Sequence, residues 1–286
     1  MQLISKLTSR ELRESVVKNY YRMATVKWTP KKEFAEFSKT VLEGKRKPFS
    51  VYKTGEVYYG VPFTRGNKAN LSEFLKVLDG QQMFFNTARM IPGADCTSSI
   101  IVSMPKNVEI PIRYITHHII WDRSVSYVLG DLDIGTECMY TDKLSEKFVA
   151  DDLYEAYSLL RIGDVLCSHY FKPDGQFIEH TRLISGVTKT VRDNGMIDAQ
   201  KSYVIISENF AKMADMTIKN NFGGELSASD YTVPYVADRF TDILKLSDFE
   251  GKNTNFRINR KIKFESLWKN YYFPLSFNFY KNHKLY

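Results

Sequence analysis

The sequence predicts an α+β fold in which helices precede an antiparallel β-sheet. Residues 8–24 carry apolar side chains at helical spacing, whereas the chain becomes rich in β-branched and aromatic residues from Phe177 onward. Asn194-Gly195 is a typical hairpin turn between the first two of these later segments. Helices followed by a run of strands favour an α+β domain over an alternating βαβ arrangement.

The first hundred residues supply most of the expected helices. Thr8 or Ser9 can cap the first helix, and a turn with a second short helix is expected over residues 28–38. A basic loop at residues 45–48 and a strand pair turning at Gly55 should follow. Two further helices are expected, over residues 71–78 and 96–104.

The second half begins with one helix and continues as strands. Residues 154–164 read as a helix that runs into a turn at Gly163-Asp164, while residues 112–129 fit neither pattern clearly. The expected strands cover residues 177–191, 202–210, 255–264 and 271–281. We expect a helical N-terminal extension, residues 1–50, packed on a core formed by residues 51–286.

Composition excludes several classes of protein. The chain has 286 residues, of which 43% are hydrophobic and 26% charged, as in ordinary soluble globular proteins. No apolar run reaches about 18 residues, so no membrane span is expected. Three scattered cysteines cannot form a disulfide framework, and five histidines without an H-E-x-x-H pattern give no metal site. We therefore expect neither a metal nor another cofactor.

The charge is unevenly distributed. Residues 1–53 carry a net charge of +8 and residues 251–286 a net charge of +7, whereas the stretch between them carries −8. Basic ends favour an anionic polymer such as cell-wall glycopolymer, nucleic acid or a membrane surface. The simpler interpretation is that they are solvated surfaces. No nucleic-acid-binding motif is present, so no nucleic-acid partner is expected.

The N-terminus does not resemble a secretory signal, because it lacks a continuous apolar stretch and a small-residue cleavage site. A cytoplasmic location is therefore expected, or the cell envelope if an export signal has been removed.

Cys96 is the candidate nucleophile. It follows Asp95 in "GADCTSSIIVSM" and stands where a short apolar helix should begin. The unpaired N–H groups and the dipole of a helix N-terminus favour the thiolate, which is the reactive form of cysteine. Taken alone, a cysteine at such a position is more often a small packing residue.

A thiol nucleophile needs a base, and His180 is the best candidate. It lies in "FIEHTRLISGV", a predicted strand whose other residues are largely typical of a core. A single histidine on a strand is more often structural. When Cys96 and His180 are considered together, a catalytic pair becomes the better interpretation of both residues.

Three motifs together resemble the NlpC-type family of papain-like cysteine peptidases. They are Asp95-Cys96 at a helix start, a Gly163-Asp164 turn before a strand, and His180-Thr181 on the next strand, and they occur in the family's order. The resemblance covers roughly residues 52–210. It implies a papain-like core in which the helix bearing the nucleophile packs on an antiparallel sheet, and a cysteine peptidase or amidase that acts on peptidoglycan peptides of the bacterial cell wall.

The resemblance also suggests supporting residues. The segment "VYYGVPF" resembles the family's upstream tyrosine-glycine segment, with Tyr59 or Tyr58 at the tyrosine. Tyr59 and Asp95 would then assist substrate binding or support the oxyanion. Thr97 stands where serine is usual, and the long interval between Gly60 and Cys96 implies an insertion around residues 71–85.

The third catalytic residue should come from the strand that returns after the hairpin. A two-residue loop at Asn194-Gly195 sets Glu208 opposite Thr181 and Asn209 opposite His180, so strict pairing favours Asn209. One bulged residue in the irregular segment 198–202 would shift this register. The family resemblance favours Glu208, whose carboxylate would orient the imidazole of His180.

A module that binds cell wall or a polyanion without catalysis is the alternative. It predicts that thiol reagents label Cys96 no faster than Cys138 or Cys167.

Overall fold

The computed structural model describes most of the chain, with several gaps. The described residues are 8–30, 33–42, 45–64, 67–80, 92–105, 125–130, 132, 149–171, 177–216, 252–269 and 272–281. His117, His118 and Cys138 therefore lie outside the described residues, as do most of residues 112–129. In the described part, no helix has both the length and the apolar composition needed to cross a bilayer.

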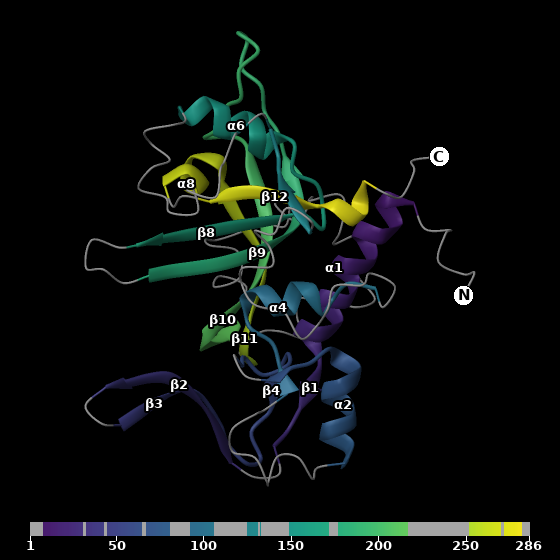
Figure 1. Ribbon diagram of the computed structural model, residues 1–286, viewed down its shortest axis with the longest axis vertical. Coiled ribbons are helices and arrows are strands. Elements are labelled where there is room, and N and C mark those ends of the chain that lie inside the picture. Colours follow the sequence, from purple (N-terminus) through teal and green to yellow (C-terminus); the bar gives the residue numbers. More distant parts are fainter. Residues whose placement is uncertain are drawn as a thin grey trace.

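A twisted eight-stranded sheet forms the centre of the molecule (Figure 1). Its strand order is β1-β4-β11-β10-β9-β8-β12-β7. The strands are β1 Lys27–Trp28, β4 Tyr58–Tyr59, β7 Ser126–Val128, β8 Val165–Phe171, β9 Phe177–Thr188, β10 Tyr203–Met216, β11 Lys252–Lys263 and β12 Phe273–Phe277. Neighbouring strands are antiparallel except β4 and β11, which run parallel, so the expectation of an antiparallel sheet holds for all but this pair.

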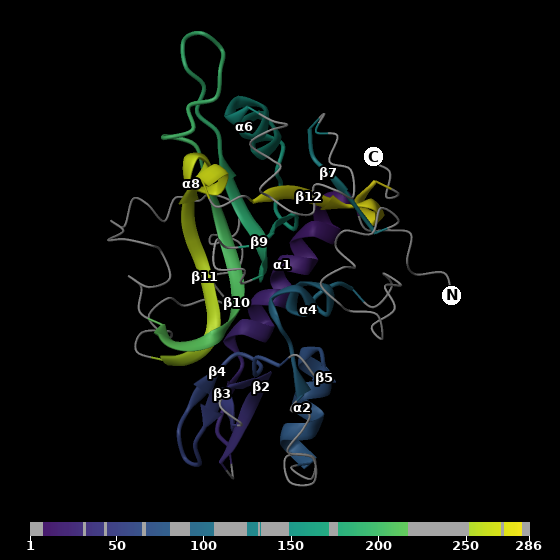
Figure 2. The same cartoon turned by 60° about the vertical axis from the view of Figure 1, so that its left-hand side comes forward.

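Helices cover both faces of this sheet, and the fold is mixed α/β. The described helices are α1 Ser9–Thr25, α2 Leu71–Gly80, α4 Cys96–Ile101, α6 Ala150–Ser158, α8 Phe264–Lys269 and the 3₁₀ turn η7 Asn278–Tyr280. Figures 1 and 2 show α1 and α4 side by side, away from α6 and α8. Successive strand residues point to opposite faces. Accordingly, Leu183 packs in the core with α1 and α4, and Ile184 packs with α6 and α8.

Helix α1 forms as its sequence predicts. Thr8 caps it: the Thr8 hydroxyl accepts a hydrogen bond from the backbone N–H of Glu11, and the Glu11 carboxylate accepts one from the backbone N–H of Thr8. Its apolar stripe is fully buried against the sheet and includes Leu12, Val16, Val17, Tyr20, Tyr21 and Met23.

A buried ion pair fixes α1 to the rest of the core. Arg13 Nη1 lies 2.6 Å from Asp164 Oδ1, and Arg13 Nη2 donates to Ser276 Oγ at 3.1 Å. Gly163 adopts φ 81°, a conformation that favours glycine, and its carbonyl accepts a bond from the Tyr280 hydroxyl. The Gly163-Asp164 turn therefore joins α1, β8 and β12, and its role in the structure is to anchor these elements.

The segment after α1 differs from the sequence prediction. Residues expected to form a second short helix and a basic loop instead form the hairpin of β2 Phe34–Leu42 and β3 Lys45–Tyr52. The two strands are joined within a few residues, so their backbone pairing outweighs the helical pattern of the local sequence. Region 1–50 is consequently helical only in its first half. The division of the chain after residue 50 stays a prediction.

The expected strand pair around Gly55 is also wrong. Gly55 does lie in a turn, with φ 82°. However, β4 beyond that turn pairs with β1 and β11, and not with β3. A separate two-stranded sheet, β5 Asn67–Lys68 and β6 Pro92–Gly93, leads into α4.

The hairpin of β9 and β10 carries the predicted site residues. Asn194-Gly195 does form its turn, with Gly195 at φ 84°. A second turn at residues 198–202 follows, in which the Ser202 N–H donates to the Asp198 carbonyl at 2.7 Å. The pairing then ends at Ser207 opposite Leu183, after a bulge at Ser185. Extended by one residue, this register sets Glu208 opposite Arg182, so the predicted register was wrong by one residue.

Candidate active site

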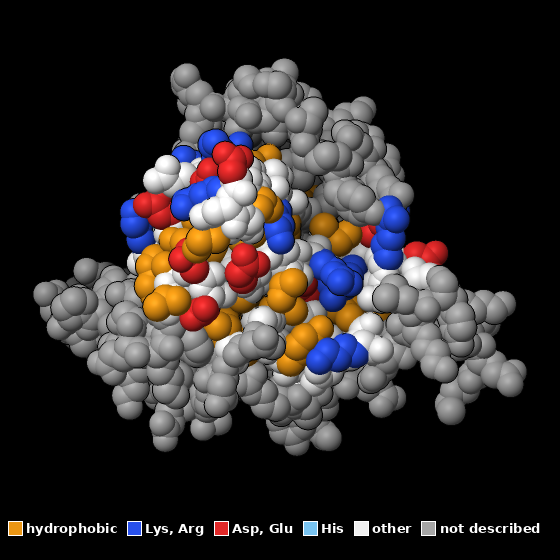
Figure 3. Space-filling view, turned by 90° about the horizontal axis from the view of Figure 1, so that it is seen from above, with side chains coloured by type: hydrophobic (Ala, Val, Ile, Leu, Met, Phe, Trp, Pro, Cys, Tyr) orange, Lys and Arg blue, Asp and Glu red, His pale blue; other side chains and the backbone are white. Residues whose placement is uncertain are grey.

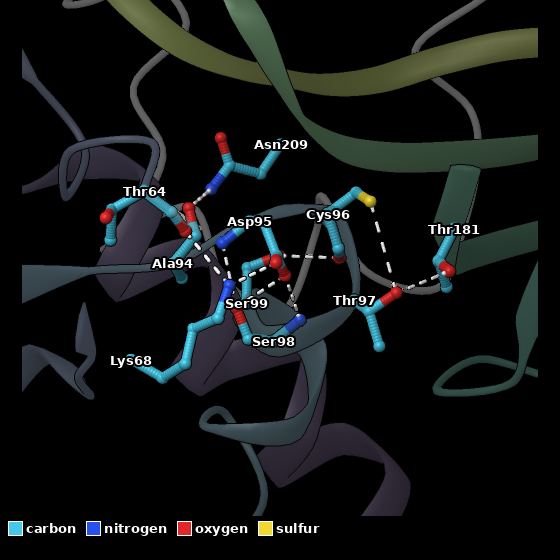
Figure 4. A network of polar contacts seen from close by, with 10 residues as sticks. All are labelled: Thr64, Lys68, Ala94, Asp95, Cys96, Thr97, Ser98, Ser99, Thr181 and Asn209. Atoms are coloured by element: carbon cyan, nitrogen blue, oxygen red, sulfur yellow. Dashed lines mark hydrogen bonds and ion pairs between the residues drawn. The ribbon is translucent and has the colours of Figure 1, made fainter. Parts of the chain in front are cut away.

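The candidate site lies at a fork in the sheet. Beyond Leu183 and Ser207, β9 remains paired with β8 and β10 remains paired with β11. The N-terminal end of α4 lies at this fork and contacts both β9 and β10. Figure 4 shows Cys96 and Thr97 between the strand that carries Asn209 and the strand that carries Thr181.

Asp95 determines where α4 begins. Its Oδ1 accepts hydrogen bonds from the backbone N–H of Ser98 at 2.8 Å and from the Ser98 hydroxyl at 2.6 Å. The Ser98 hydroxyl also accepts from the Asp95 N–H, which completes a reciprocal cap. Lys68 Nζ contacts the other carboxylate oxygen, Oδ2. In the structure Asp95 is a helix cap, and its predicted part in oxyanion support stays a prediction.

Cys96 is the first residue of α4 and its side chain is partly exposed. A backbone N–H at this position has no acceptor within the helix. Cys167, by contrast, is 2% exposed, and burial raises the pKa of its thiol. Of the two described cysteines, Cys96 is therefore the one that a reagent or substrate can reach.

A pair of threonines joins helix α4 to strand β9. The Thr97 and Thr181 hydroxyls lie 2.9 Å apart, and both residues are buried. The Cys167 thiol lies 3.7 Å from the Thr181 hydroxyl. These contacts fix the residue after Cys96 to the residue after His180.

His180 pairs directly with a carboxylate. Its Nε2 donates to Glu208 Oε2 at 2.6 Å, since an ionised carboxylate only accepts. The Cys96 thiol also acts on this imidazole and raises the pKa of His180. The structure therefore pairs His180 with Glu208 and sets Cys96, through the Thr97–Thr181 contact, beside the strand that carries His180.

The charges of these groups are coupled. Burial alone would lower the pKa of His180, but its interactions with Cys96 and Glu208 outweigh this effect and raise the pKa to about 9. Burial alone would raise the pKa of Glu208, whereas its bond to His180 and the charges of His180, Arg182 and Arg260 hold it well below the usual range. Glu208 is thus ionised beside an imidazole that favours its protonated form.

Asn209 makes a different contact. Its Nδ2 donates to the Ala94 carbonyl at 2.8 Å, as Figure 4 shows, and its Oδ1 is buried without a partner among the described residues. Successive residues of β10 point to opposite sides, which separates Asn209 from Glu208. Asn209 therefore positions the segment before Cys96, while Glu208 contacts the histidine.

Tyr59 lies farther along the sheet. It is on β4, opposite Lys27 and Thr254, and its side chain is 8% exposed within the core that includes α1. Its proposed part in substrate binding stays a prediction. Tyr58 is also buried, and its hydroxyl donates to Glu56.

Sequence reasoning missed the arginines around Glu208. Arg182 Nε lies 2.9 Å from Oε2, Arg260 Nη1 lies 2.5 Å from Oε1, and Arg257 Nη1 lies 3.7 Å from Oε1. Arg182 could have been noticed, because it lies two residues from His180 on the same strand. No local signal identified the arginines of β11.

A surface hollow lies at the opposite end of α4. It is lined by residues of α1 and α2 together with Val102, Ser103, Met104 and Pro105. It does not include Cys96 or His180, so it is separate from the candidate site.

No protein-family model, curated protein or solved structure matches the chain.

Proposed function

We propose that the chain is a cysteine hydrolase with a papain-like core, in which Cys96 attacks an amide carbonyl and His180 transfers the proton. The observation that carries the proposal is the hydrogen bond between His180 and Glu208 next to the start of α4, where the Thr97–Thr181 contact fixes the residue after Cys96 to the residue after His180. A nucleophile, a base and a group that orients the base are the parts that this chemistry requires.

The steps follow from the contacts. His180 holds the thiol proton as an imidazolium, the form that its raised pKa favours, and the Cys96 thiolate adds to the carbonyl carbon of the substrate. Glu208 keeps the imidazole oriented and stabilises the imidazolium that forms. The backbone N–H of Cys96, which has no acceptor within the helix, donates to the oxyanion. The imidazolium then gives its proton to the departing amine, and water hydrolyses the thioester by the reverse sequence.

The substrate class rests on the family resemblance. Under this proposal the substrate is a peptide of bacterial peptidoglycan, cleaved by a peptidase or amidase reaction without a metal or other cofactor. The helix bearing Cys96 and the neighbouring strands that carry His180 and Glu208 fit the arrangement that the resemblance implies.

The alternative is a module that binds wall polymer or another polyanion without chemistry. The basic ends of the sequence favour it. On the face of the molecule seen in Figure 3, however, acidic and basic side chains are interspersed among hydrophobic ones. Binding without catalysis also does not require a partly exposed thiol near a buried His180–Glu208 pair.

The test is the peptide profile of purified peptidoglycan after incubation with the protein. We expect new fragments with the wild-type chain and none with Cys96→Ala, and we expect iodoacetamide to abolish the activity while EDTA leaves it intact. Equal binding of wall by both proteins without new fragments would favour the binding module. Loss of activity in EDTA but not in iodoacetamide would refute the nucleophile assignment.

A further inference from the structure

Three arginines crowd one carboxylate beside the candidate site. Glu208 accepts hydrogen bonds from Arg182 and Arg260 and forms a longer ion pair with Arg257. Within the described part of the chain, it is the only carboxylate within ion-pair distance of any of the three. We call Arg182, Arg257 and Arg260 the arginine cluster.

A bulge in β11 aims two of these arginines at the same place. The pairing with β10 steps from Ile206–Arg260 to Glu208–Arg257, so that an extra residue is inserted into β11. Asn259 occupies this bulge with φ 56°, and its side chain accepts a hydrogen bond from the Tyr21 hydroxyl. Residues three apart on a regular strand would face opposite sides. The bulge re-aims them, and both reach Glu208.

The cluster carries more positive charge than Glu208 can balance. Three guanidinium charges face one carboxylate, whose Oε2 already accepts from His180 and Arg182 and whose Oε1 accepts from Arg260. Arg257 Nη1, at 3.7 Å, is beyond hydrogen-bond distance. Burial lowers the pKa of Arg257, and the Arg260 and Arg182 charges lower it further, against the opposing effect of Glu208. An excess of partly buried charge is unfavourable without an anion.

Arg257 is the member best placed to meet that anion. Its side chain is 28% exposed, the most of the three. The guanidinium carbon lies 4.5 Å above the centre of the Phe210 ring, which in turn meets the His180 imidazole edge-on with 5.6 Å between ring centres. Phe210 therefore holds an incompletely paired guanidinium next to the imidazole.

We infer that the arginine cluster binds a carboxylate of the substrate on the leaving-group side of the scissile amide, with Arg257 as the principal contact. The inference rests on the proposed function, in which His180 gives its proton to the departing amine and that amine lies beside the imidazole. A planar guanidinium binds a carboxylate through two parallel N–H···O bonds. The substrate class is thus a peptide whose departing part bears a carboxylate.

The test uses alkylating probes that differ only in that group. N-iodoacetylglycine and N-iodoacetylglycinamide form one pair, and N-iodoacetylglycylglycine and its amide form a longer pair. Each added residue extends the reach by at most about 3.6 Å. The labelling rate at Cys96 is followed by peptide mass spectrometry, and each acid-to-amide ratio is divided by the ratio for N-acetylcysteine.

We expect a corrected ratio of roughly tenfold in favour of the acid for at least one of the two lengths. High salt should reduce it, because screening weakens attraction to exposed charge. Arg257→Gln should lower the ratio to about that of N-acetylcysteine, and Arg257→Lys should retain part of it. Arg192→Gln, on the exposed hairpin turn, is the matched control that removes one charge elsewhere and should keep the wild-type ratio.

The outcomes separate this inference from the proposed function. A wild-type ratio near one at both lengths overturns the inference without needing any variant, as does an undiminished ratio in Arg257→Gln. Rapid labelling of Cys96 by the amide probes would still support the nucleophile in those cases. If the amide probes label Cys96 no faster than Cys138 and Cys167, the proposed function fails and this inference fails with it.

Discussion

Thr97 and Thr181 share a hydrogen bond of 2.9 Å, and they are the residues that directly follow Cys96 and His180. Both side chains are buried, at 2% and 3% exposure. The bond therefore sets how closely the start of α4 approaches β9. The position of the thiol relative to the imidazole depends on it, although neither hydroxyl takes part in the proposed chemistry.

Replacing Thr97 by Val should thus affect Cys96 by changing the position of its thiol relative to the His180 imidazole. Valine keeps the shape but leaves the Thr181 hydroxyl without this partner, at a cost of about 1–2 kcal/mol in the free energy of unfolding. Cys96 should also react more slowly with iodoacetamide. The double variant Thr97→Val/Thr181→Val should lose less stability than the two single losses combined, because no hydroxyl is then left unpaired. Additive losses with unchanged labelling would show that the bond does not position the site.

The coupling of His180 to its neighbours predicts a pH dependence of stability. Its pKa is raised in the folded protein from 6.5 to about 9. A raised pKa stabilises the fold fully below the unfolded value, and this contribution is lost as the pH rises through about 9. The stability advantage of the wild type over His180→Gln should therefore shrink by on the order of 2 kcal/mol between pH 6.5 and 9.5. Urea unfolding of both proteins across this range measures it. A constant or growing difference would contradict the assignment of the raised pKa.

Two substitutions of Asp95 distinguish its role as a helix cap from a direct role in catalysis. Asp95→Ala removes both bonds to Ser98 and should cost about 1 kcal/mol of stability. Asp95→Asn keeps a good cap at Oδ1 but loses both the charge and the acceptor that face Lys68. Asparagine should therefore restore most of the stability and the Cys96 labelling rate. If asparagine is as damaging to labelling as alanine while stability is normal, the carboxylate itself takes part in the chemistry.

Local signals predicted the elements that carry the site, but not the final register of the hairpin. The capping pattern at Asp95 and the strand pattern around His180 are properties of short segments, and both were readable from the sequence. The hairpin turn at Asn194-Gly195 was equally local. The turn at residues 198–202 and the bulge at Ser185 together shifted the pairing, and their lengths depend on tertiary contacts.

The arginine cluster could not be predicted for a related reason. Arg257 and Arg260 face Glu208 only because Asn259 forms a bulge, and Asn259 is held by Tyr21 on α1. That contact joins residues far apart in the chain. At β2 the local sequence pattern predicted a helix, but the segment instead forms a strand that pairs with β3.

Asn209 should affect the position of Cys96 without affecting the histidine. Asn209→Ala removes the bond to the Ala94 carbonyl, two residues before Cys96, and should cost about 1–2 kcal/mol of stability. The labelling rate of Cys96 should fall moderately, whereas the pH at which His180 titrates should stay the same. Histidine titration followed by NMR distinguishes the two effects. A shift in that titration would mean that Asn209, and not only Glu208, determines the protonation of His180.

Glu208 is the most demanding position to test, because it balances the arginines as well as orienting the imidazole. Glu208→Gln leaves three guanidinium groups around a neutral amide. We expect a loss of about 3–5 kcal/mol in the free energy of unfolding. We also expect a steep fall in peptidoglycan cleavage at temperatures where the variant is still folded. Glu208→Gln/Arg260→Met removes one of the crowded charges and should recover part of the stability but none of the activity. Full activity in folded Glu208→Gln, together with an inactive Asn209→Ala, would move the third catalytic role to Asn209.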